Sequence, residues 1–118
     1  MNKLCSELKK WGCDVDGAKK RCLDDEDFYC KLIKTVMHDP SFEELGRTLE
    51  EGDITKSFDL AHSLKGSLSN VGLTPLYDLI VEIVEPLRAG NIQGLAIPYL
   101  KLTKRKEEFD EILRDCGY

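Results

Sequence analysis

The chain contains the stretch His62-Ser63-Leu64-Lys65-Gly66-Ser67-Leu68-Ser69-Asn70-Val71-Gly72, which has the pattern of the C-terminal half of an amphipathic helix. An α-helix turns about 100° per residue, so apolar side chains at the right spacing gather on one side of it. Here that side consists of Leu60, Ala61, Leu64, Leu68 and Val71. His62 falls nearly opposite, on a stripe shared with Phe58, Lys65, Gly66 and Ser69. The stretch therefore predicts a helix that buries its apolar side and exposes His62.

Gly66 is unexpected inside such a helix, because an interior glycine costs about 1 kcal/mol relative to alanine. The apolar pattern continues beyond Gly66, so the glycine does not mark a helix end. Its missing side chain leaves space beside His62, and Lys65 places a positive charge where an anion attached to His62 would lie. A neutral imidazole has a nucleophilic ring nitrogen, and phosphoryl transfer needs mainly positioning and charge neutralisation. The pattern favours a histidine that accepts a phosphoryl group.

The motif His62-x-Leu64-Lys65-Gly66, with a second glycine at Gly72, resembles the signature of histidine-containing phosphotransfer (HPt) domains. The resemblance covers about residues 14–113 and includes the continuation Gly72-Leu73-Thr74-Pro75-Leu76. The chain departs from the family pattern at Leu68, where a small residue is usual. This departure is expected to alter packing under the motif rather than its chemistry.

The resemblance implies a role for each residue of the motif. His62 would carry the phosphoryl group on Nε2, and Lys65 would neutralise its charge. Gly66 would let a partner domain approach closely, and Ser69 would hydrogen-bond the phosphoryl group or the imidazole. The edge of the docking surface for that partner would include Phe58 and Leu68.

The resemblance also implies a relay function. His62 would take a phosphoryl group from the aspartyl phosphate of a response-regulator receiver domain, or from a hybrid histidine kinase, and pass it to another receiver. The receiver would supply an acidic pocket and Mg²⁺, so no cofactor is expected to bind this chain. Walker A, G-x-S-x-G and H-E-x-x-H motifs are missing from the sequence. The chain is therefore expected to be a phosphohistidine carrier rather than an enzyme.

Three other interpretations of His62 remain open. The residue is a plain surface histidine, or it binds a metal with Asp59 or Asp78, although metal sites in bundles are built from side chains that project into the core. A third interpretation is a non-phosphorylated adaptor that binds receiver or kinase domains and blocks them. An adaptor has no need of the His62, Lys65 and Gly66 set, so phosphotransfer is the preferred hypothesis.

Apolar residues recur at helical spacing along the chain, and no alternating strand pattern is found. We therefore predict an all-α fold, with an up-down antiparallel four-helix bundle and additional short N-terminal helices. Residues 1–118 are expected to form a single domain with its core at about 14–113. The resemblance implies the same fold.

Helix ends are predicted from local signals. Asp53 is expected to cap the helix that contains His62, and Ser41 with Glu44 matches a capping box. Thr74 is expected to cap the next helix, with proline at its first position.

Two prolines are expected to disturb the later helices. Pro86 lies inside an apolar pattern and predicts a kink or an altered last turn. The last helix is expected to begin at Asn91, with a break or delay at Pro98.

Charge and composition limit the partners. The net charge of −5 and pI of about 5.1 argue against nucleic acid. No apolar run approaches the ~20 residues of a membrane span, and the N-terminus has no apolar signal region. We therefore expect no membrane association and a cytoplasmic location. The resemblance to an isolated relay module implies a monomer. Five cysteines without a C-x-x-C pair are expected to be buried or half-buried small hydrophobes: Cys5, Cys13, Cys22, Cys30 and Cys116.

Overall fold

A computed structural model describes residues 2–118, and these residues form seven helices and no strand. The all-α fold class is confirmed. The helices are α1 (Lys3–Lys10), α2 (Val15–Arg21), α3 (Glu26–Met37), α4 (Ser41–Glu51), α5 (Ile54–Asn70), α6 (Thr74–Arg88) and α7 (Ala96–Asp115).

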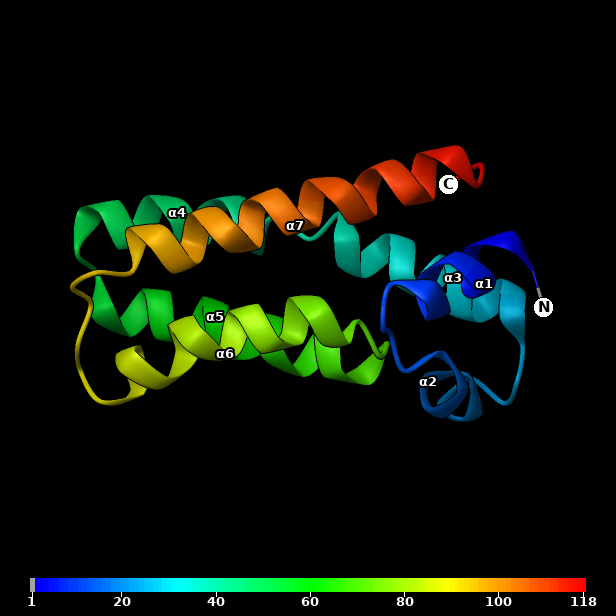
Figure 1. The fold of residues 1–118 in the computed structure, drawn as a ribbon. Coiled ribbons are helices and arrows are strands. Elements are labelled where there is room, and N and C mark those ends of the chain that lie inside the picture. The colour runs from blue at the N-terminus through cyan, green and yellow to red at the C-terminus, as the bar shows by residue number, and fades with distance from the viewer. Residues whose placement is uncertain (1) are drawn as a thin grey trace.

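Helices α4 to α7 form the predicted antiparallel bundle. Figure 1 shows α4 beside α7 in one layer and α5 beside α6 in the other. Helices α1 to α3 gather at one end, where the C-terminal half of α7 extends over them (Figure 1). The result is an elongated molecule of 43 × 25 × 21 Å. One long face of the α5–α6 pair is left uncovered by other helices.

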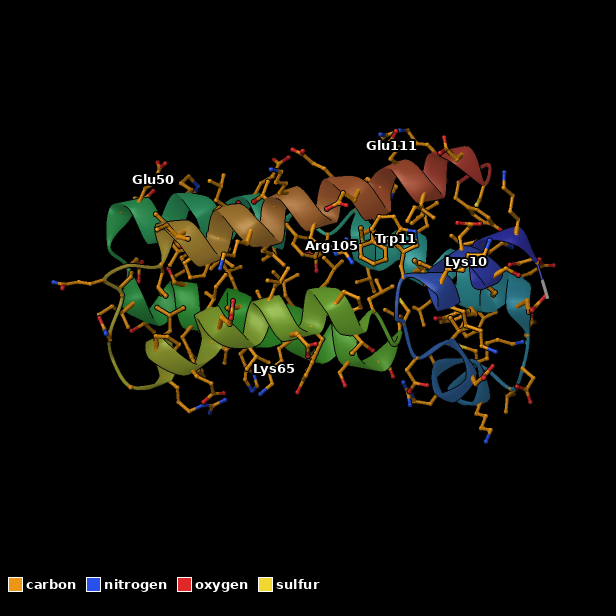
Figure 2. All side chains as sticks on the ribbon, in the orientation of Figure 1. Lys10, Trp11, Glu50, Lys65, Arg105 and Glu111 are labelled. Carbon is orange, nitrogen blue, oxygen red and sulfur yellow. The ribbon has the colours of Figure 1, made fainter. Side chains whose placement is uncertain are left out.

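Aromatic contacts join the N-terminal helices to the bundle. The rings of Trp11 and Phe109 meet edge to face at 5.8 Å between centroids. The Arg105 guanidinium lies 4.5 Å from the Trp11 centroid, and Figure 2 shows these two side chains between α7 and α1. Inside, the buried Tyr29 hydroxyl donates a hydrogen bond to the Val71 carbonyl at 2.8 Å. These contacts make α1 to α3 part of one continuous core.

The C-terminus of α5 is tied to α2 by backbone and side-chain hydrogen bonds. Gly72, which ends α5, accepts a bond from the Asp14 amide at 2.9 Å. The Arg21 guanidinium donates to the carbonyls of Asn70 at 2.8 Å and Ser69 at 3.1 Å. Cations favour helix C-termini because the last carbonyls lack intrahelical partners. Arg21 therefore stabilises the end of the helix that carries His62.

One of the three predicted caps is confirmed. The Asp53 carboxylate accepts a hydrogen bond from the Lys56 amide at the start of α5. The capping box at Ser41 is wrong, because Pro40 already has helical φ and ψ angles and Ser41 is the first helical residue. The Thr74 cap is also wrong, since Leu73 is the N-cap of α6 and makes no side-chain bond.

The predicted start of the last helix is wrong by five residues. The chain cannot continue as a helix from Asn91, because Gly94 adopts a left-handed φ of +75°. Helix α7 begins at Ala96, so Pro98 lies in its first turn, where a missing N–H costs no hydrogen bond. Pro86 lies in the last turn of α6, which continues to Arg88.

The five cysteines are free thiols. Four are buried and Cys116 is half-buried, as the sequence predicted. Burial raises the pKa of the Cys5 thiol and of the Cys13 thiol to about 12. These thiols stay protonated at neutral pH and act as packing groups.

Candidate functional site

Helix α5 presents His62 to solvent. The apolar side of the helix faces the core, with Ala61, Leu64 and Leu68 inaccessible and Leu60 half-buried. His62 is exposed on the opposite side, so the predicted orientation of the histidine is confirmed. Figure 2 shows Lys65, one turn from His62, on the side of α5 and α6 that faces away from α4 and α7. A partner can therefore reach the imidazole without any change in the bundle.

An aromatic ring supports the imidazole from one side. The rings of Phe58 and His62 stack with centroids 5.4 Å apart and an interplanar angle of 24°. Phe58 is half-buried, and the guanidinium of Arg88 on α6 lies 5.2 Å from its centroid. Stacking of this kind limits the rotation of the imidazole and leaves its other face open.

A chain of charges runs beside the histidine from α5 to α6. The Lys65 ammonium lies 3.7 Å from Oε1 of Glu85. The other carboxylate oxygen of Glu85 lies 3.4 Å from Nε of Arg88. Figure 2 shows Lys65 on the side of α5 and α6 that faces away from α4 and α7. The site thus contains two cations and one carboxylate.

Gly66 and Gly72 of the motif are glycines for different structural reasons. A Cβ atom at Gly66 would meet nothing within 4 Å, so packing inside the protein does not require glycine there. Gly72 has a φ of +70°, and a Cβ atom there would collide with the Asp14 carbonyl and come within 3.1 Å of the Ala18 side chain. Gly72 is needed by the fold, whereas Gly66 keeps an outer surface free of side chains.

The other two predicted site residues have different outcomes. Ser69 is exposed one turn beyond Gly66, on the His62 side of the helix. Leu68 was predicted at the docking edge and is fully buried, so that assignment is wrong. The reason is helical geometry, because Leu68 follows Leu64 by four residues and belongs to the core-facing stripe.

A model of the Hpt domain family matches residues 35–113, which is more than half of the chain. The chain belongs to the Hpt domain family. The match begins inside α3 and covers α4, α5, α6 and most of α7, including the whole site around His62. No curated protein and no solved structure gave a significant match. Hpt domains are phosphocarrier modules of two-component signalling, so a general phosphotransfer role follows from membership.

Two residues of this site in the Hpt domain, Glu85 and Arg88, were not predicted from the sequence. Both lie on the exposed side of α6, three residues apart, a spacing that places them on one helix face. The three-residue spacing in the sequence was enough to predict the ion pair between Glu85 and Arg88. The sequence could not predict that Glu85 lies near Lys65, because this contact depends on how α6 is aligned against α5.

Within residues 2–118, no group of three or more His, Cys, Asp or Glu side chains is placed to hold a metal ion. None of the helices described is both long and apolar enough to cross a membrane.

Proposed function

We propose that His62 is the phosphoacceptor of a phosphorelay. In the forward step, a lone pair on the imidazole attacks the phosphorus of a receiver aspartyl phosphate, and the resemblance to HPt domains assigns this to Nε2. The bond between phosphorus and the carboxylate oxygen breaks, the aspartate leaves as a carboxylate, and the imidazole releases one proton. The reverse step delivers the group to another receiver. The observation that carries the proposal is an exposed, ring-stacked imidazole beside Lys65 on an Hpt bundle.

The surrounding residues suit this chemistry. Lys65 would compensate charge on the transferred group, and the open backbone at Gly66 would admit the receiver surface. Ser69 is a candidate hydrogen-bond donor, and Phe58 is the apolar edge of the docking surface. The receiver would supply Mg²⁺ and the acidic pocket, and a hybrid histidine kinase is the alternative donor. The chain itself would bind no cofactor and would act as a carrier.

The proposal is tested by phosphoryl transfer from a panel of phosphorylated receiver domains in the presence of Mg²⁺. We expect acid-labile, base-stable label on the wild type and none on His62→Gln. The matched control is His38→Gln, which changes the other exposed histidine, at the end of α3, and should keep full labelling. Circular dichroism should be the same for all three proteins, because both histidines are exposed.

Two results would contradict the proposal. Equal labelling of wild type and His62→Gln would place the phosphoryl group elsewhere. No label from any receiver, together with measurable binding to one, would favour a non-phosphorylated adaptor.

Since all site residues come from one chain, we propose that the protein acts as a monomer. We also propose that it acts in the cytoplasm.

A further inference from the structure

The carboxylate of Glu85 lies between the two cations of the site. Its Oε1 faces Lys65 at 3.7 Å, and its Oε2 faces Arg88 at 3.4 Å. Each oxygen is thus directed to one cation. The Glu85 and Arg88 side chains are 51% and 50% exposed, so both have room to move. Glu85 occupies the position that an anion attracted by Lys65 and Arg88 would take.

Both cations also belong to the surroundings of His62. Lys65 is one helical turn from it, and Arg88 contacts the Phe58 ring on which the imidazole stacks. A phosphoryl group on His62 would bring roughly two negative charges. That group would have to compete with Glu85 for the same cations, because two cations cannot fully compensate three negative charges.

We propose that Glu85 is an internal counter-anion that makes the phosphoryl group on His62 less stable. This inference rests on the proposed phosphoacceptor role of His62. Before phosphorylation, Glu85 compensates Lys65 and Arg88. After phosphorylation, it competes with the new group for these two cations, which favours onward transfer. Glu85 acts through the two cations and is therefore a positioning residue.

The test is exchange of a phosphoryl group between N-phosphoimidazole and His62, followed by phosphorus NMR. The phosphorus–nitrogen bond of the donor breaks, the same kind of bond forms at His62, and free imidazole leaves with the proton that His62 loses. The equilibrium constant therefore compares the stability of the phosphoryl group on His62 with its stability on free imidazole. For Glu85→Gln we expect this constant to rise by about threefold to tenfold, since two half-exposed ion pairs are removed.

Charge-matched and coupled variants separate the mechanism from a general charge effect. Glu111→Gln removes an exposed carboxylate from α7, far from the site (Figure 2), and should leave the constant unchanged. In a Lys65→Met, Arg88→Met background, the effect of Glu85→Gln should shrink toward none, because its partners are gone. A constant that is equal in wild type and Glu85→Gln would overturn the proposal, as would an equal change in Glu111→Gln.

A separate result would contradict the relay role of His62. Phosphorylated protein that no receiver can dephosphorylate would contradict the relay, whatever residue stands at position 85. The ratio of exchange constants would still be measured in that case and would decide the role of Glu85 separately.

Discussion

At the scale of single residues, the chemistry proposed for His62 depends on its immediate neighbours. The Phe58 ring holds one face of the imidazole, and the Lys65 ammonium provides the nearest cation on the same helix. Lys65 is only partly accessible, with 26% of its side chain exposed, so its charge is held near the site. Glu85 keeps this charge paired in the unphosphorylated protein.

Replacing Lys65 should slow phosphoryl transfer without unfolding the protein. Lys65→Ala removes the cation that we propose compensates charge on the transferred group, and we expect the rate to fall by about tenfold. The measurement is the initial rate of label transfer from a phosphorylated receiver. Lys56→Ala, an exposed lysine in the first turn of α5, is the control and should transfer at the wild-type rate. An unchanged rate in Lys65→Ala would remove this residue from the mechanism.

At the scale of elements, α5 combines a core-facing side, buried at Ala61, Leu64 and Leu68, with an outer side that has no side chain at Gly66. Its N-terminus is capped by Asp53, and its C-terminus is held by Gly72 and Arg21. Both ends are therefore stabilised, so a glycine in the middle is tolerated. The site belongs to two elements, because α5 supplies the histidine and α6 supplies Glu85 and Arg88.

The two glycines of the motif, Gly66 and Gly72, should respond oppositely to alanine. Gly66→Ala should raise the free energy of unfolding by about 0.5–1 kcal/mol, since alanine favours a helix interior and the added methyl meets no atom. The same variant should transfer more slowly, because under the proposed mechanism the methyl group would obstruct the receiver. Gly72→Ala should lower the free energy of unfolding by more than about 1 kcal/mol, because of its positive φ and the Asp14 carbonyl.

Urea denaturation and the transfer assay together check this pair. A Gly66→Ala protein that is less stable than wild type would show that the glycine serves the fold. Full transfer by that variant would show that the receiver does not approach the backbone there.

At the scale of the whole molecule, α1 to α3 close one end of the bundle. An ion pair of 3.1 Å between Lys19 on α2 and Glu26 on α3 helps to hold these helices together. The hydrogen bond from the Lys19 ammonium lowers the pKa of the Glu26 carboxyl below its usual value. The backbone amide of Asn2 also donates to Glu26, at 3.3 Å. The N-terminal helices are thus linked by a group that titrates in acid.

The acid stability of the protein should depend in part on Glu26. Because its folded-state pKa is lowered, its contribution is fully present above the unfolded value of about 4.3 and is lost as the pH falls through the folded value. Glu26→Gln should therefore flatten the decline of the melting temperature with falling pH in this range. The exposed Glu50 on α4 provides the control, Glu50→Gln, which should keep the wild-type slope. Equal slopes in all three proteins would contradict the linkage.

Much of this protein follows from local sequence patterns. The apolar spacing around His62 correctly predicted a helix with a buried side and an exposed histidine, and the same periodicity predicted the all-α bundle. Such predictions succeed because the helical repeat depends only on neighbouring residues. The same spacing placed Leu68 in the core, so its assignment to the docking edge conflicted with a pattern already in the sequence.

Tertiary structure decided the rest of the site. Whether Glu85 and Arg88 reach Lys65 and Phe58 depends on the alignment of α6 against α5, and that alignment is set by many side chains packing at once in the core. No short stretch of sequence contains this information. Local periodicity therefore determined which way His62 faces, whereas packing between helices determined which charges surround it.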